Sequence, residues 1–250
     1  MSVSLVPLQA QFGSRAGGVG GPPRGPRLGG ATARLFGDNS AFSATLEMQT
    51  KEPGTGETIT MPGQLAFVAG NSRFAMDLTK MKGGPTRPEA AVQMKAMGLD
   101  TIVKISRSDK QVSYLVYPGL QAYVENPLPE SEAVAPASDY KVQTTELGKE
   151  TLDGHPCVKH KAVVTDSNGA KHESTVWNAT DLKNFPIKIE QTENGQAITM
   201  RFTDITLSKP EESIFDPPAG FARYDNMQSM MQQVMMKRFG GGPARPSRDK

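Results

Sequence analysis

The sequence predicts a mainly β protein, in which one antiparallel sheet and two α-helices form a single folded domain. Most of the central part alternates apolar and polar residues with a period of two, the pattern of strands that bury one face. Turn residues separate these stretches at short intervals, as in consecutive hairpins. No helical stretches lie between them that could serve as the crossovers of a parallel sheet. The order of elements therefore favours an antiparallel meander.

Ten alternating stretches are expected to be strands. They are residues 42–48, 65–69, 74–78, 102–105, 112–116, 120–124, 158–165, 174–177, 187–189 and 198–202. Asn168-Gly169 is the strongest hairpin turn, because these residue types tolerate positive φ. Gly70-Asn71 is expected to turn the chain between the second and third stretches.

Two amphipathic helices are predicted. Residues 88–97 begin with proline, which suits a first helical position, and residues 226–239 carry an apolar stripe at helical spacing. A glycine follows each helix, as expected for a helix end. A third, shorter helix near Gly119 or over residues 131–140 is an alternative, although the proline-rich stretch 126–136 favours a loop.

The two ends of the chain differ in composition from the middle. Residues 1–34 are expected to be a signal remnant followed by a disordered tether rich in Gly, Pro and Arg, and residues 240–250 a disordered tail. Residues 2–11 resemble the second half of a secretory signal peptide, and the alternative is a disordered terminus with a few apolar residues. Residues 35–239 are then a single domain.

Charge and hydropathy narrow the range of possible functions. The net charge is +2 and no basic stripe occurs, so nucleic-acid binding is not expected. The sequence contains no run of 18 apolar residues, so no membrane-spanning helix is predicted. Arginines near the N-terminus indicate a solvated tail, with an RNA-binding tail as the alternative. They are Arg15, Arg24, Arg27 and Arg34.

The histidines and the single cysteine are weak candidates for a metal site. His155 and Cys157 face one side of a strand and His160 faces the other. A two-residue turn places His172 opposite Thr165, several residues from His160 along the ladder. A zinc or copper site is therefore a less favoured role for these histidines than a position on the surface or in an ordinary hydrogen bond. The sequence nominates no cofactor, no catalytic residue and no enzyme motif.

Methionine is unusually frequent, with 13 in the chain. Its flexible, polarizable side chain suits a lining that must accept varied apolar shapes. The alternative for any one methionine is ordinary core packing. Copper(I) capture by the thioethers of residues 227–236 is a further possibility.

The C-terminal third of the predicted domain resembles the bacterial LolA/LolB-like proteins, also called outer-membrane lipoprotein-sorting-like proteins. The resemblance lies in Gly148, residues 152–157 (LDGHPC), residues 177–189 (WNATDLKNFPIKI) and residues 215–221 (FDPPAGF). It implies a curved antiparallel sheet that forms an incomplete β-barrel, with two or three α-helices covering its open mouth. It also implies a bacterial periplasmic or secreted protein that binds a lipid or an acylated protein.

Two hypotheses follow for the function. In the first, the protein binds an apolar ligand in the cavity of the incomplete barrel, lined by Phe42, Phe67, Phe74, Met76, Met94, Met97 and Tyr114. In the second, the cavity is filled and the protein is an interaction or scaffold module of the cell envelope. The partner-docking candidates are then Met227, Met230, Met231 and Met235.

Overall fold

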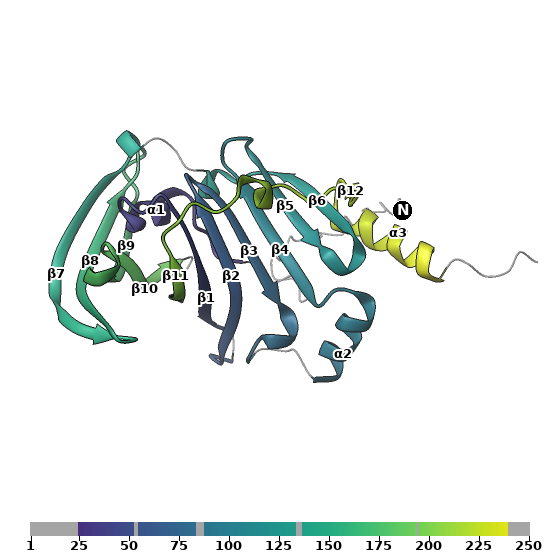
Figure 1. Cartoon of the computed structure of the whole chain (residues 1–250), viewed down its shortest axis with the longest axis horizontal. Coiled ribbons are helices and arrows are strands. Elements are labelled where there is room, and N and C mark those ends of the chain that lie inside the picture. Colours follow the sequence, from purple (N-terminus) through teal and green to yellow (C-terminus); the bar gives the residue numbers. More distant parts are fainter. Residues whose placement is uncertain (1–24, 53–54, 84–87, 134–136, 194, 240–250) are drawn as a thin grey trace, which may run out of the picture.

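A computed structural model describes residues 25–52, 55–83, 88–133, 137–193 and 195–239. These residues form one sheet of twelve strands that curves without closing into a barrel (Figure 1). The strands are β1 (Ala41–Lys51), β2 (Thr58–Val68), β3 (Asn71–Asp77), β4 (Thr101–Arg107), β5 (Val112–Tyr117), β6 (Ala122–Pro127), β7 (Lys141–Leu152), β8 (His155–Thr165), β9 (Lys171–Ala179), β10 (Phe185–Glu193), β11 (Gln196–Thr206) and β12 (Ala222–Tyr224). Their spatial order is β12-β6-β5-β4-β3-β2-β1-β11-β10-β9-β8-β7.

Every neighbouring pair in the sheet is antiparallel except β12 and β6, which are parallel. The predicted fold class, a mainly β protein with an incomplete barrel, is confirmed. The β2–β3 turn lies one residue before the predicted position, because Val68 pairs with Asn71 and the positive φ angles fall at Ala69 and Gly70.

The helices are α1 (Gly30–Ala33), α2 (Pro88–Met97) and α3 (Met227–Phe239). Both predicted helices are present, and Asn226 caps α3 by accepting a hydrogen bond from the Ser229 amide at 2.8 Å. Within the described ranges, no helix is both long and apolar enough to cross a membrane.

Two further regions were uncertain or missed in the prediction. Near Gly119 and within residues 131–140, where a third, shorter helix was left open and a loop was favoured, the described residues form only short 3₁₀ turns. Strand β7 was not predicted, because only Gly148 and Leu152 are even half-buried along it. A strand exposed on both faces has no apolar alternation to reveal it.

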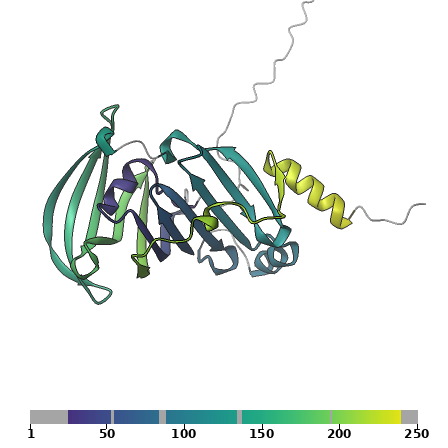
Figure 2. The same cartoon turned by 45° about the horizontal axis from the view of Figure 1, so that its top comes forward.

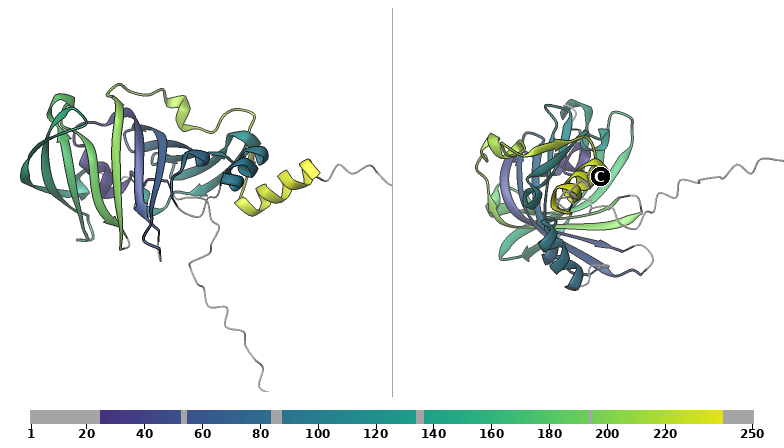
Figure 3. Two further views of the ribbon diagram at one scale, coloured as in Figure 1. Left: turned by 90° about the horizontal axis from the view of Figure 1, so that it is seen from below. Right: turned by 90° about the vertical axis from the view of Figure 1, so that its right-hand side faces the viewer.

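The sheet has two separate apolar faces. The concave face carries the main core, which includes Phe42, Leu46 and Ile189. The convex face of β2–β5 carries a smaller cluster around Ile105 and Val116. A segment of residues 207–221, here called the strap, runs from β11 to β12 across this convex face and buries Phe215 in the cluster (Figure 3).

Residues 25–36, here called the N-terminal segment, lie against the concave face (Figure 2). Leu28 and Phe36 are 3% and 1% exposed. A Cβ atom on Gly29 would lie 1.9 Å from the Glu132 carbonyl oxygen, so only glycine fits there. The folded domain therefore begins earlier than the predicted boundary at residue 35. The physical reason is that a few apolar side chains bury themselves while the glycines allow close packing.

Two cations, one at the end of β4 and one in the β4–β5 turn, hold the strap in place. Arg107 Nη1 and Lys110 Nζ each donate to Asp216 Oδ1 at 2.8 Å. These contacts, the Lys110 hydrogen bond first, lower the pKa of Asp216 below its usual range. A carboxyl group whose pKa is lowered by folding stabilises the folded state at pH values above its unfolded-state pKa of about 4. This contribution is lost as the pH falls through the folded-state pKa.

We therefore expect Asp216→Asn to lower the thermal midpoint near neutral pH by about 2 °C, the effect of somewhat under 1 kcal/mol in a domain of this size. The effect is small because the Asp216 side chain is 44% exposed and screened by solvent. The difference between the two proteins should shrink as the pH falls below about 4. A difference that is constant with pH would show that the carboxylate charge does not fasten the strap.

Candidate functional site

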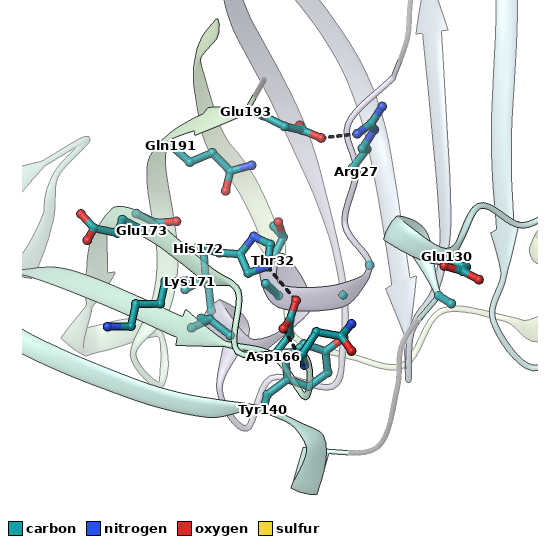
Figure 4. Close-up of a pocket in the computed structure, with 18 of the residues that line it drawn as sticks. Arg27, Thr32, Glu130, Tyr140, Asp166, Lys171, His172, Glu173, Gln191 and Glu193 are labelled. Atoms are coloured by element: carbon teal, nitrogen blue, oxygen red, sulfur yellow. Dashed lines mark hydrogen bonds and ion pairs between the residues drawn. The ribbon is translucent and has the colours of Figure 1, made fainter. Parts of the chain in front are cut away.

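A pocket of about 850 Å³ opens on the concave side, between the N-terminal segment and the region of β8, β9 and β10 (Figure 4). Its wall is built from residues far apart in the sequence. The residues that line it are Arg27, Gly29, Gly30, Ala31, Thr32, Leu35, Gln111, Glu130, Ala133, Tyr140, Val164, Asp166, Ser167, Asn168, Lys171, His172, Glu173, Ser174, Gln191, Thr192 and Glu193. Its volume lies in the range of small-molecule sites.

The β8–β9 hairpin forms one side of the pocket. Asp166 Oδ1 accepts the amide hydrogens of Asn168 and Ala170, both at 2.9 Å, and Gly169 has a φ of 80°. This is a three-residue hairpin loop closed by a residue with positive φ. His172 consequently faces Val164 instead of Thr165. The expected two-residue turn was wrong by one position.

Two contacts between ionisable side chains lie on the pocket wall. Arg27 of the N-terminal segment forms an ion pair with Glu193 at the end of β10. His172 Nε2 lies 3.2 Å from Asp166 Oδ2, and this contact is the largest cause of the lowered pKa of Asp166 (Figure 4). Glu130, Lys171 and Glu173 also line the wall, and Glu173 forms its ion pair with Lys161, which lies outside the wall.

The wall also contains an apolar floor and neutral polar groups. Leu35 and Val164 are 8% and 1% exposed and supply the floor. The Tyr140 ring stands at the side, with the Arg34 guanidinium 4.9 Å from its centroid. Thr32 and other hydroxyl and amide side chains supply hydrogen-bonding groups around the opening. Such a wall suits a ligand with an apolar part and an uncharged or weakly charged polar end.

The predicted ligand-binding residues divide between the two faces. Phe42, Phe67, Phe74 and Met76 share the concave core and are 0–4% exposed. Phe42 and Phe67 belong to a cluster of stacked and tilted rings that includes Phe36. These side chains fill the concave face beside the pocket and are not part of its wall.

The other predicted residues lie elsewhere. Tyr114 is in the convex cluster, under the strap, because residues 112, 114 and 116 of β5 face that side. On α2, Met94 packs against the concave core and Met97 is half-buried. Tyr114 therefore does not share a cavity with the other candidates.

The methionines of α3 pack mainly inward. Met230 is fully buried, and Met227 and Met231 pack partly against the concave core. A partner could reach Met230 only if α3 moved. The side chain of Met235 lies outside the described residues, and Met236 is 65% exposed.

The histidine rings have separate partners, and the Cys157 thiol donates to the His155 backbone carbonyl at 3.3 Å. His155 pairs with Asp181, His160 contacts Asn178, and Cys157 is buried in the core. In the described part of the chain, no three His, Cys, Asp or Glu side chains gather where they could hold a metal ion.

Sequence reasoning missed the pocket itself. Its wall joins the N-terminal segment, assigned to a disordered tether, to a hairpin whose polar residues looked like an ordinary turn. The one indication of this part of the wall in the sequence was the pair Asp166 and His172, which flank the Asn-Gly turn. A hairpin loop of odd length brings their side chains together across the turn.

Comparison with known proteins finds likeness only among solved structures. No family model matches the chain, and no curated protein matches it. A LolA superfamily protein from Nitrosomonas europaea is 11% identical, with a TM-score of 0.39, over 73% of this chain and 93% of the other. Lipoprotein LppX from Mycobacterium tuberculosis is 11% identical, with a TM-score of 0.40, over 69% and 92%.

A putative outer-membrane lipoprotein-sorting protein domain from Vibrio parahaemolyticus is 13% identical, with a TM-score of 0.35, over 74% of this chain and 92% of that domain. The matched structures thus include the family that residues 148–221 resemble. At these identities the likeness concerns the fold alone, so the site is argued from this chain's own residues.

Proposed function

We propose that this chain is a non-enzymatic protein of the bacterial cell envelope that binds an apolar ligand, a lipid or an acyl chain, on the concave side of its sheet. The observation that carries the proposal is the pocket of about 850 Å³ with a buried apolar floor and a polar opening. An acyl chain would lie on Leu35 and Val164, and its polar end would meet the hydroxyl and amide groups. The resemblance of residues 148–221 to LolA/LolB-like proteins supports the periplasmic or secreted location.

Filling the pocket tests the proposal. We expect Thr32→Trp to weaken binding of a fluorescent long-chain fatty acid at least tenfold, because the indole occupies space that the chain needs. Thr79→Trp is the matched control, since Thr79 is exposed and is not part of the pocket wall. Fluorescence titration measures both. Equal affinity in the two variants, or no uptake by the wild-type protein, would count against this site.

The scaffold function remains a second candidate because of one specific observation. The rings of Phe36, Phe42, Phe67, Phe185 and Phe202 pack together and fill much of the concave face. These rings occupy space that the predicted cavity would need. If the scaffold function is right, native mass spectrometry of protein purified from a bacterial envelope shows the bare chain mass, and Thr32→Trp changes no binding.

A further inference from the structure

The two edges of the sheet are protected very differently. At one edge, β12 is three residues long, and α3 packs against both β12 and β6. At the other edge, β7 runs for twelve residues with no strand on its outer side among the described residues (Figure 1). Short strands and covering helices are common ways to block pairing at an edge. Strand β7 has neither, and its edge protection is limited to charged side chains such as Lys141 and Lys149 and a bulge at Leu147.

Strand β7 is also exposed on its faces. Four large apolar side chains are exposed in the described part of the chain, and two of them, Val142 at 45% and Leu147 at 54%, lie on β7. A long edge with unpaired backbone N–H and C=O groups is a template for an added strand. The exposed apolar side chains would gain burial from such a neighbour.

We propose that β7 is a homodimer interface, in which the β7 strands of two copies pair antiparallel across a two-fold axis and join their sheets edge to edge. Two-fold dimers are the commonest symmetric assemblies, and their interfaces are self-complementary. The net charge of +2 gives little repulsion between two copies. The occupant is thus a second copy of this chain.

The charges and the length of β7 restrict the register. In an antiparallel pair related by a two-fold axis perpendicular to the sheet, one residue faces its own copy. Centring on Thr145 would bring Lys141 opposite Lys149, and centring on Glu146 would bring two glutamates face to face. Centring on Gln143 or on Thr144 places no like charges directly opposite, and like charges opposite one another destabilise a sheet. Centring on Thr144 pairs residues 141–147 and opposes Lys141 to Leu147, whereas centring on Gln143 pairs only residues 141–145.

The bulge in β7 fits this register. The pairing of β7 with β8 shifts between Glu146 and Gly148, so Leu147 is an extra residue on β7. A bulge bends the strand and interrupts a ladder. The paired part of each copy therefore runs from Lys141 to Leu147, with the Thr144 pair at its centre.

The dimer would bring the two candidate sites close to its junction. Tyr140, which immediately precedes β7, lines the pocket, and Val142 pairs with Val164 on the pocket floor. The concave faces of the two copies would then continue into one another. The interface does not depend on the ligand, so the dimer and the proposed function are tested independently of each other.

Cross-linking tests the register. Single cysteines at Gln143, Thr144, Thr145 and Glu146, in a Cys157→Ala background, should form intermolecular disulfides most readily at Thr144→Cys, because directly opposed Cβ atoms are close enough to bridge. The yield should fall on both sides of position 144. Circular dichroism verifies that each variant is folded. Absent or equal cross-linking at all four positions would overturn the register.

Analytical ultracentrifugation tests the interface itself. The wild-type chain should show a mass that rises from monomer to dimer with concentration. Thr144→Lys, which sets two lysines face to face, should raise the dissociation constant at least tenfold. Thr151→Lys, on β7 beyond the bulge, should leave it unchanged. A wild-type chain that stays monomeric at every concentration would overturn the proposal, whether or not another protein's strand occupies this edge.

Discussion

Phe36→Ala is expected to destabilise the protein by about 3–5 kcal/mol, one of the two largest single-residue effects in the structure. The Phe36 side chain is 1% exposed, and its ring centroid lies 4.8 Å from that of Phe42 and 5.7 Å from those of Phe67, Phe185 and Phe202. Truncation removes a ring that joins the N-terminal segment to β1, β2, β10 and β11. The surrounding strands cannot collapse fully into the space, so a cavity remains.

Urea unfolding followed by the fluorescence of Trp177, the only tryptophan, measures this effect. Phe221→Ala is the matched control, because Phe221 is only half-buried, on the strap, and its loss should cost clearly less. A cost below about 1 kcal/mol for Phe36→Ala would mean that the N-terminal segment is not part of the folded core.

Lys104→Met is expected to have an effect of similar size through a different mechanism. Lys104 Nζ lies 2.7 Å from Glu132 Oε1, and the two side chains are only 19% and 9% exposed. Ser106 Oγ donates to the other carboxylate oxygen at 3.0 Å. Removing the ammonium leaves a buried carboxylate without its charge partner, which typically costs about 3–5 kcal/mol.

The double variant Lys104→Met/Glu132→Leu separates charge burial from packing. Replacing both members of a buried ion pair by apolar groups is often nearly neutral, so most of the loss should be recovered. Lys80→Met is the surface control, because Lys80 is 71% exposed beside Asp77 and should leave the unfolding midpoint unchanged. Equal destabilisation in the single and double variants would show that the loop around Glu132 is held by shape and not by charge.

Most of the sheet could be predicted because its strands bury one face. On β1, Phe42, Leu46 and Met48 are buried in alternation with less buried neighbours, and α2 begins at a proline and is followed by Gly98. Strand β7 escaped prediction because neither of its faces is buried. The N-terminal segment escaped because its composition matches a tether, whereas Leu28 and Phe36 gain enough burial to order it.

The candidate site was predictable only in part. The apolar character of the concave face follows from residues such as Phe74 and Met76, which sequence periodicity assigns to one side. Tyr114 satisfies the same periodicity, yet it faces the strap, and no local pattern tells the concave face from a convex face that a later segment covers. The pocket depends on contact between Arg27 and Glu193, which are 166 residues apart, and such contacts are not written in local spacing.

The most direct measurement is a crystal structure of the protein grown with a long-chain fatty acid that carries bromine at its end. The anomalous signal of bromine marks where the apolar end of the ligand lies. The proposed function predicts a single peak between the N-terminal segment and β8, near Leu35 and Val164. A peak beneath the strap on the convex face, or an empty concave side in crystals that contain the fatty acid, would contradict it.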